Sequence, residues 1–317
     1  MIELSKKNWV VLILLSFTLA CNKAPNEPDS NQHDVEYLGV AAPSNQSIVF
    51  KPDSVCTGNI ELGMAVHPNL EEFYFTRLNN AFEGTIFASK KNNDEWTNPE
   101  PAVFSGTYND TDPFITTDGN YLYFTSDRPL QNGSSGNKPH IWFVTKIENG
   151  WSAPQPVYFK LQSRIGESSP SLTSSGTLYF IANFSTLGGE GLYRSEFVDG
   201  KFKDPEYCSV LKNSNGIVEV EPFISSDETF ILFYSAGRND NYTPNGQIGD
   251  VYIAFRNNDN TWGDPKNLGS AVNTSGEESH PTLTPDGKYF FFARNVGRDN
   301  GFVDIFWIDA GFLKSFK

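Results

Sequence analysis

The chain has 317 residues, of which 38% are hydrophobic and 14% aromatic, and its formal net charge is −14 at pH 7. A chain of this length can bury a large core, and an all-β chain of this size can form a single domain. Its lysines and arginines form no cluster or stripe, so the sequence lacks a phosphate-binding footprint and we expect no nucleic-acid partner.

The first twenty residues have the anatomy of a signal peptide. Lys6 and Lys7 precede the apolar run Trp9–Leu15, which is too short to span a bilayer as a mature helix. The residues Thr-Leu-Ala-Cys that end at Cys21 resemble a lipobox, in which the cysteine becomes the lipidated first residue. We therefore expect residues 1–20 to be removed and Cys21 to anchor an outer-membrane lipoprotein of the cell envelope, with secretion without a lipid as the alternative.

A polar segment follows the expected lipidation site. Residues 21–46 are rich in Asn, Pro, Ser, Glu and Asp, and such a composition cannot bury enough apolar surface to fold. We interpret this segment as a flexible tether and residues 47–317 as the folded domain.

From residue 47 onward, one β unit recurs about every fifty residues. Its clearest copy, residues 278–294, combines a short strand, a turn at Pro285-Asp286-Gly287 and an aromatic strand. The last aromatic of this second strand is our anchor residue, and the anchors are Phe75, Phe124, Phe180, Phe233 and Phe292. Third strands are expected at residues 85–90, 140–146, 192–197, 250–256 and 304–308. Short outer strands are expected at residues 101–104, 156–159, 207–211 and 267–269. Several strands within each period of this length predict a β-propeller.

The fifth unit lacks an outer strand of its own. Residues 47–52 (Ser-Ile-Val-Phe-Lys-Pro) precede the first unit and have the composition of an outer strand. We predict that they complete the fifth blade and close the ring, which leaves only short, protected sheet edges. A six-bladed ring, with a degenerate blade before Glu61, is the alternative.

The repeat as a whole carries a family resemblance. The pattern acid-x-x-P-x-x-x-x-D-G-x-x-x-x-F, followed by a third strand and D/N-G-x-W-x-x-P, resembles the TolB-type, WD40-like β-propeller repeat over about residues 47–317. The first unit departs most from it, since Met64 replaces the proline. The resemblance implies an all-β, five-bladed propeller of four-stranded antiparallel blades, and a TolB-like role in docking envelope proteins through one rim. It specifies the fold more closely than the function, because propellers host unrelated chemistries.

One carboxylate recurs at the start of every innermost strand. These residues are Glu61, Asp110, Glu167, Glu219 and Glu278. Because the strands alternate in direction, these starts share one rim with the long polar loops between second and third strands. We interpret the five acids as a ring at the channel mouth that binds a cation, an amine or a basic segment. The alternative is that they are a repeated packing device bonded to backbone amides of the adjacent blade.

Three further residues are candidates for ion pairing or ligand binding. Arg77 and Arg294 lie two residues after their anchors and are expected to pair with neighbouring acids. His280 lies two residues after Glu278, so strand alternation predicts that both point to the same face. One histidine and dispersed acids do not have the spacing of a zinc site, so we expect no metal and no cofactor. Cys56 and Cys208 fall on distant parts of the predicted ring and are expected to remain free thiols.

These observations favour a binding module over an enzyme. No G-x-S-x-G motif occurs, and we predict no catalytic residue. The alternatives are a carbohydrate-active enzyme, a glycosidase or lyase that uses channel-mouth carboxylates as acid and base, and a polysaccharide-binding protein. The binding module is favoured because catalytic carboxylates occupy different environments, whereas these acids repeat with the fold.

Overall fold

The computed structural model describes residues 36–130, 138–161, 163–208, 217–243, 248–297 and 302–317. The predicted signal peptide, Cys21 and most of the predicted tether lie outside these residues. Residues 36–317 form one compact unit. Among the described residues, no helix has the length and apolar character needed to cross a membrane.

Five groups of antiparallel strands, here called blades, follow one another along the chain. A parallel pairing of Val303 with Ile60 joins the first and the fifth blade into one nine-stranded sheet. The first blade contains β4 (Ile60–Val66), β5 (Glu72–Leu78), β6 (Gly84–Asn92), β7 (Glu95–Trp96) and β8 (Glu100–Pro101). The second contains β9 (Asp110–Ile115), β10 (Tyr121–Ser126), β11 (His140–Ile147), β12 (Gly150–Trp151) and β13 (Gln155–Pro156). The third contains β14 (Glu167–Leu172), β15 (Leu178–Phe184), β16 (Gly189–Ser195) and β19 (Glu206–Tyr207), with a separate hairpin of β17 (Phe197–Val198) and β18 (Lys201–Phe202). The fourth contains β20 (Val218–Ile224), β21 (Phe230–Ala236), β22 (Gly249–Phe255) and β23 (Lys266–Asn267). The fifth contains β24 (Glu278–Leu283), β25 (Tyr289–Gly297), β26 (Phe302–Asp309) and β3 (Ile48–Val49).

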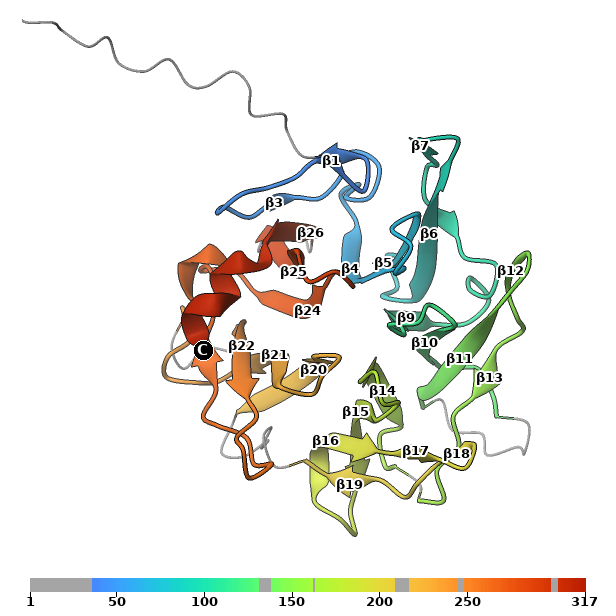
Figure 1. Cartoon of the computed structure of the whole chain (residues 1–317), viewed down its shortest axis with the longest axis vertical. Helices are drawn as coiled ribbons and strands as arrows, with labels where there is room; N and C mark the ends of the chain where they lie inside the picture. Colours follow the sequence, from blue (N-terminus) through green and yellow to red (C-terminus); the bar gives the residue numbers. More distant parts are fainter. Residues whose placement is uncertain (1–35, 131–137, 162, 209–216, 244–247, 298–301) are drawn as a thin grey trace, which may run out of the picture. The chain divides into compact units, whose positions relative to one another are not determined.

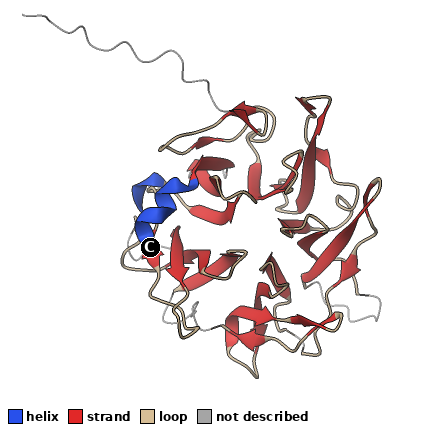
Figure 2. Cartoon of the chain, in the orientation of Figure 1, coloured by secondary structure: helices blue, strands red, loops and turns tan. Residues whose placement is uncertain are grey.

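Within this unit the blades surround a common axis, and the first strand of each blade lies nearest to it (Figure 1). Nearly all of the regular structure is strand (Figure 2). The described helical segments are the short 3₁₀ turns η1 (Gly269–Ala271) and η2 (Ala310–Phe316). In η2, Phe312, Leu313 and Phe316 pack against the hydrophobic cluster shared by the fourth and fifth blades. The sheet topology is therefore that of a propeller, with short outer strands.

The five anchor phenylalanines form the hydrophobic centre of the blades. Phe75, Phe124, Phe180 and Phe233 have 0% of their surface exposed, and Phe292 has 1%. Aromatic residues that follow the third strands pack between neighbouring blades. Trp151 of the second blade packs against Tyr74 of the first with ring centroids 6.1 Å apart, and Trp262 of the fourth packs against the cluster that contains Tyr179 of the third.

The predicted closing strand completes the fifth blade. β3 pairs antiparallel with β26, with Val49 opposite Phe306, and the Phe50 N–H donates to the Ile305 carbonyl at 2.8 Å. Phe50 is fully buried between Phe73 of the first blade and Phe291 of the fifth, at centroid distances of 5.4 and 5.1 Å. The segment before Glu61 therefore joins the two ends of the described fold instead of forming a degenerate sixth blade.

The compact unit begins earlier than the boundary at residue 47 that composition indicates. β1 (Glu36–Tyr37) and β2 (Val40–Ala41) form a hairpin whose Tyr37 and Leu38 are only 7% and 5% exposed. Tyr37 packs against Tyr289 with ring centroids 4.4 Å apart, and its hydroxyl donates to Asp286 at 3.0 Å. Two large side chains are enough to bind this otherwise polar stretch to the fifth blade.

Candidate functional site

Every innermost strand contains a β-bulge shortly after its first carboxylate. The register with the second strand shifts there in all five blades. The bulge residues have a left-handed backbone, with φ between 49° and 64°, and they are Gly63, Asp112, Ser169, Glu221 and His280. In non-glycine residues this conformation costs about 1 kcal/mol each. Because a bulge interrupts strand alternation, the carboxylate and the bulge residue point in different directions.

Contacts with the preceding blade hold the bulges in place. The Asp112 N–H donates to the Thr76 hydroxyl at 3.2 Å, and the Ser169 N–H donates to the Thr125 hydroxyl at 3.0 Å. The His280 N–H donates to a Glu221 carboxylate oxygen at 2.8 Å. The bulge is therefore part of the repeated packing of the blades, whereas its side chain is free to differ from blade to blade.

The five predicted carboxylates do not form an exposed ring. Glu61, Asp110, Glu167, Glu219 and Glu278 are only 0–5% exposed. Each forms an ion pair, and the pairs are Glu61–Arg77 (2.9 Å), Asp110–Arg128 (2.8 Å), Glu167–His140 (2.6 Å), Glu219–Arg238 and Glu278–Arg294 (2.9 Å). Burial raises the pKa values of Glu61, Asp110 and Glu278 despite these partners. The sequence-based expectation of an acidic ring is thus corrected, because the bulge turns these side chains into the blades.

Arg77 and Arg294, the two arginines singled out in the sequence, make two of these ion pairs. Both also donate to backbone carbonyls, Arg77 to Val55 at 2.9 Å and Arg294 to Val272 at 2.6 Å. Four of the five pairs lie within one blade, and only His140–Glu167 joins two blades. These charges therefore stabilise the interior of the blades.

The bulge residues lie at the axis instead. We call Gly63, Asp112, Ser169, Glu221 and His280 the axial collar, and they line a cavity of about 50 Å³ to which all five innermost strands contribute. His280 joins the two acids of the collar: its Nε2 lies 3.6 Å from Asp112 Oδ1 and its Nδ1 lies 3.2 Å from Glu221 Oε2. The three side chains remain 17–21% exposed. A proline follows four of the five collar residues and also lines the cavity. The rings of Phe114 and Phe223, whose centroids are 6.4 Å apart, line it as well.

The collar acids differ in their electrostatic environment. Burial alone would raise the pKa of Asp112, but the bond to His280 and the hydroxyls of Thr125 and Thr111 outweigh it and lower the pKa. Burial raises the pKa of Glu221, and the charge of His280 only partly offsets this effect. Burial alone would lower the pKa of His280, but Glu221, Asp112 and Glu277 outweigh it and raise the pKa to about 8. At neutral pH the collar therefore combines one imidazolium with two carboxyl groups.

The size of the collar limits what it can hold. Ligand pockets for drug-sized molecules measure about 300–1,000 Å³, so a cavity of about 50 Å³ accepts an ion, a water molecule or an ammonium group. No cluster of three or more His, Cys, Asp or Glu side chains suitable for a metal ion occurs among the residues that the structure describes.

Sequence reasoning singled out His280 but missed Asp112 and Glu221. A signal was present, since the position two residues after each repeated acid holds Gly, Asp, Ser, Glu and His in turn. When one position of a regular repeat holds a different residue type in every unit, the fold does not require a particular side chain there. Such a position is therefore a candidate for a binding site.

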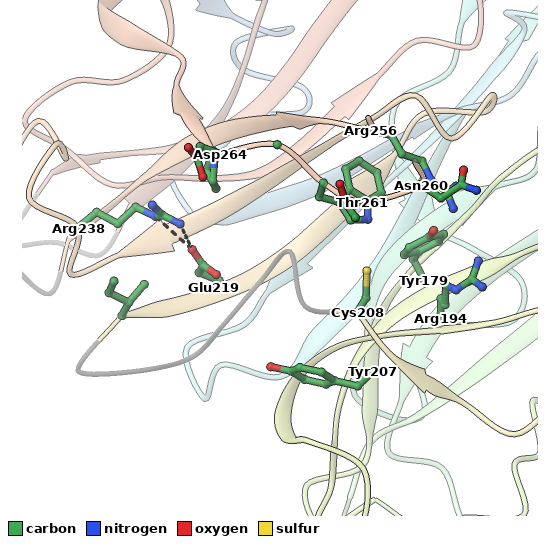
Figure 3. A pocket seen from close by; sticks show the side chains of 14 residues that line it. Tyr179, Arg194, Tyr207, Cys208, Glu219, Arg238, Arg256, Asn260, Thr261 and Asp264 are labelled. Atoms are coloured by element: carbon green, nitrogen blue, oxygen red, sulfur yellow. Dashed lines mark hydrogen bonds and ion pairs between the residues drawn. The ribbon is translucent and has the colours of Figure 1, made fainter. Parts of the chain in front are cut away.

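Two larger hollows lie between blades, away from the axis. One, of about 690 Å³, lies between the third and fourth blades and is lined by charged and aromatic side chains that include Arg194, Arg238 and Trp262 (Figure 3). Its lining includes Cys208 and Ile217, and residues 209–216 between them lie outside the described residues. The other, of about 790 Å³, lies between the second and third blades, and seven of its twenty lining residues are aromatic.

No disulfide joins Cys56 and Cys208, the two cysteines of the described fold, as predicted from their separation on the ring, and both are buried. Cys56 lies beside β26, where its sulfur accepts from the Ile305 N–H at 3.3 Å, and burial raises the pKa of its thiol strongly. Cys208 belongs to the cluster between the third and fourth blades.

Comparison with known proteins places the fold but not the function. No family model matches the chain, and no curated protein matches it by sequence. Among solved structures, an endo-arabinanase of glycoside hydrolase family 43 from Bacillus licheniformis aligns with a TM-score of 0.52 and 11% identity over 80% of this chain and 94% of its own. A candidate TolB from Agrobacterium tumefaciens aligns with a TM-score of 0.49 and 13% identity over 80% of this chain and 78% of its own. The catalytic domain of a family 62 α-L-arabinofuranosidase from Coprinopsis cinerea aligns with a TM-score of 0.49 and 14% identity over 84% of this chain and 95% of its own. At such identities only the fold is comparable, and the arabinanase match supports a distant similarity to five-bladed β-propellers.

Proposed function

We propose that this protein is a non-catalytic binding module of the cell envelope that holds a cationic group of a partner protein at the axial collar. The collar itself carries this proposal. It brings Asp112, Glu221 and His280 together where all five blades meet, whereas the repeated acids are already neutralised by ion pairs.

The charge and the size of the collar favour an amine. Two carboxyl groups face one imidazolium, so the collar attracts a second cation when both acids are ionised. A molecule of water occupies about 30 Å³ in the liquid, and an ammonium group of similar size fits the cavity of about 50 Å³. A lysine side chain or an amino terminus of a partner supplies such a group on a slender stem.

The cellular setting rests on the leader and on the repeat. The apolar leader and Cys21 support attachment of the domain to the envelope, and the TolB-type repeat supports docking through one rim of the propeller. The strong net negative charge of the chain favours basic partners.

Titration of the purified protein with a lysine-rich decapeptide tests this function. We expect binding that is lost when the lysines are acetylated, and that is weakened at least about tenfold in the double variant Asp112→Asn/Glu221→Gln, because the collar then carries no anion. Glu95→Gln, an exposed acid on β7, is the matched control and should retain binding. Equal binding of the acetylated and unmodified peptides, or equal loss in the control, would contradict the proposal.

A glycosidase is the second candidate, because Asp112 and Glu221 have pKa values shifted in opposite directions, as in a catalytic acid–base pair. Against it, His280 contacts both acids and the cavity is too small for a sugar ring. A hydrolysis screen on plant and bacterial polysaccharides decides between the two. Release of product by the native protein, abolished in Glu221→Gln, would replace the binding module with the enzyme.

A further inference from the structure

Three blades place a buried tyrosine immediately before the anchor phenylalanine. Tyr74, Tyr123 and Tyr179 are 1%, 7% and 0% exposed, and each faces the following blade. A buried hydroxyl needs a hydrogen-bond partner, because leaving it unsatisfied costs about 1–3 kcal/mol. The three interfaces can therefore be compared by the group that accepts the hydrogen bond of the tyrosine hydroxyl, which we call its cap.

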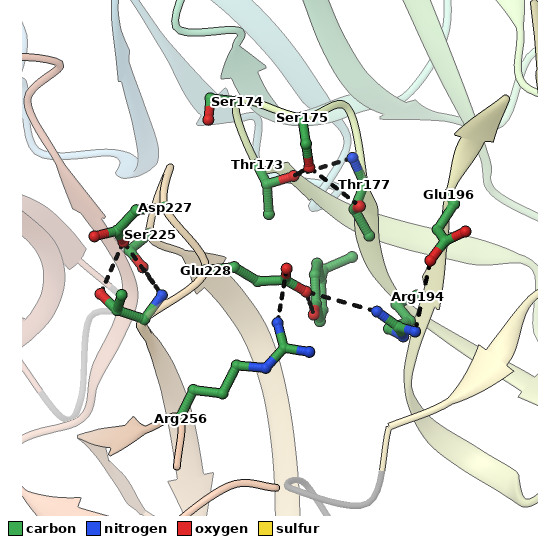
Figure 4. Close-up of polar contacts among 12 residues, drawn as sticks. Thr173, Ser174, Ser175, Thr177, Arg194, Glu196, Ser225, Asp227, Glu228 and Arg256 are labelled. Atoms are coloured by element: carbon green, nitrogen blue, oxygen red, sulfur yellow. Dashed lines mark hydrogen bonds and ion pairs between the residues drawn. The ribbon is translucent and has the colours of Figure 1, made fainter. Parts of the chain in front are cut away.

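Two of these interfaces cap the hydroxyl with an ion pair. Between the first and second blades, Tyr74 donates to Glu72 at 2.7 Å, and Lys146 of the second blade binds the other oxygen of the same carboxylate. Between the third and fourth blades, Tyr179 donates to Glu228. Arg256 of the fourth blade lies 2.7 Å from that carboxylate, which Figure 4 shows between Arg194 and Arg256. In both cases an acid caps the tyrosine and a cation of the next blade neutralises the acid.

The interface between the second and third blades has lost both charged groups. Gly176 occupies the turn position of Glu228: each donates its N–H to the residue three positions earlier, at 3.0 and 2.9 Å, and each has a positive φ. By the pairing of Leu178 with Ser195, Glu196 occupies the position of Arg256, so no cation stands there. Glu196 pairs with Arg194 and Lys203 of its own blade, and the next residue, Phe197, lines the interface. Within the described part of the chain no group hydrogen-bonds to the Tyr123 hydroxyl. Its oxygen is not among the fully buried polar atoms, so it can bond to a molecule in the adjoining cleft.

The loss of this ion pair leaves a cleft. We call it the aromatic cleft: a hollow of about 790 Å³ whose walls include Tyr121, Tyr123, Phe143, Tyr158 and Phe197. Tyr121, Tyr158 and Phe197 are 38%, 54% and 49% exposed, which is unusual for side chains of this size that lie together. The cleft lies near the ends of β9 and β14 that are remote from the collar, and all of its lining residues are described.

We propose that the aromatic cleft binds a neutral oligosaccharide. A sugar ring has apolar C–H faces that pack against aromatic rings, and hydroxyl groups at its edge that hydrogen-bond to polar groups of the wall. The Tyr123 hydroxyl at the wall and the hydroxyls of Thr117 and Thr145 offer such hydrogen bonds. The ion pair of the sister interfaces is absent here. The charged residues of the lining, Asp118, Lys160 and Lys201, are exposed and of both signs, so the cleft does not select for a charged ligand. A volume of about 790 Å³ accommodates several sugar rings.

This site is independent of the axial collar and extends the proposed function to a second ligand. A protein that docks a partner at its axis and holds a glycan at its side would link an envelope protein to a polysaccharide. The two sites can be tested separately, because no residue is shared between them.

Calorimetric titration of the purified protein with a panel of neutral hexasaccharides tests the cleft. The panel contains gluco-, xylo-, manno- and arabino-oligosaccharides in their common linkages, and decaproline is added as a representative of extended peptides that also bind aromatic grooves. We expect at least one saccharide to bind, and decaproline not to bind.

Substitutions then locate the binding. Tyr158→Ala/Phe197→Ala should weaken saccharide affinity at least about tenfold, and Tyr123→Phe about tenfold, through loss of stacking and of one hydrogen bond. Tyr179→Phe is the matched control: it removes a capped hydroxyl, so it should lower stability and leave saccharide affinity unchanged. The collar variant Asp112→Asn/Glu221→Gln should also bind the saccharide normally.

Three results would overturn the inference. They are the absence of binding to every saccharide of the panel, saccharide binding that the cleft variants leave unchanged, and binding of decaproline at the cleft in place of a saccharide. The last result would identify the cleft as a peptide site. Because the lysine-rich peptide is measured on the same protein, failure of the cleft is distinguishable from failure of the collar.

Discussion

Truncation of Phe50 provides the most direct test of how the ring closes. Phe50 is fully buried and contacts three rings, those of Phe73, Phe291 and Trp307, at centroid distances of 5.1–5.4 Å. These rings come from the first and fifth blades, so one side chain fills the joint between the two ends of the fold. Replacement by alanine removes the ring and leaves a cavity whose lining belongs to two blades.

The expected cost is large. Phe→Ala substitutions in protein cores destabilise by about 3–5 kcal/mol. The cluster around Phe50 contains many rigid aromatic side chains, and Met64 is its flexible member. For a domain of this size each kcal/mol lowers the midpoint by about 2–4 °C, so we expect Phe50→Ala to melt roughly 10 °C below the native protein.

Thermal and urea unfolding followed by circular dichroism measure this change. The matched control is Phe82→Ala, because Phe82 is 70% exposed and its truncation should change stability by less than about 0.5 kcal/mol. The transition of Phe50→Ala should remain single, since closure of the ring stabilises the whole unit. A loss below about 1 kcal/mol, or fraying of only one end before the main transition, would refute the role of β3 as the closing strand.

Three further predictions follow from the buried charges and thiols. Asp110→Asn should destabilise the fold by about 3–5 kcal/mol in urea unfolding, because Arg128 is left charged and only 7% exposed; the double variant Asp110→Asn/Arg128→Met should recover most of this loss, and no recovery would argue against the ion pair as the cause. The pKa of His280 is raised from 6.5 to about 8 by Glu221, Asp112 and Glu277, so its contribution of about 2 kcal/mol should be complete below pH 6.5 and disappear as the pH rises through 8; the difference in unfolding free energy between the native protein and His280→Gln should therefore be larger at pH 6 than at pH 9, and an equal difference would contradict the assignment. Burial raises the pKa of the Cys56 thiol, so iodoacetamide at pH 8 should label it only after unfolding, and mass spectrometry of the native protein should find it unmodified.

The sequence by itself determined the architecture. Regular spacing of Phe75, Phe124, Phe180, Phe233 and Phe292 identified five units, and each of these anchors is almost completely buried in its blade. The missing outer strand of the fifth unit and the apolar residues 47–52 likewise indicated how the ring closes. The same reasoning underestimated the compact unit at its start, where Tyr37 and Leu38 lie within a polar stretch whose average composition conceals them.

The tertiary structure alone decided which side chains form a site. Counting along an ideal strand puts Glu278 and His280 on one face, whereas the bulge at His280 sends Glu278 into the blade towards Arg294 and His280 to the axis. A bulge has no sequence signature here, because Asp, Ser, Glu and His adopt the left-handed conformation only where contacts with the preceding blade impose it. The aromatic cleft likewise depends on Gly176 and Phe197, which become neighbours only through strand pairing and through the packing of the third blade on the second.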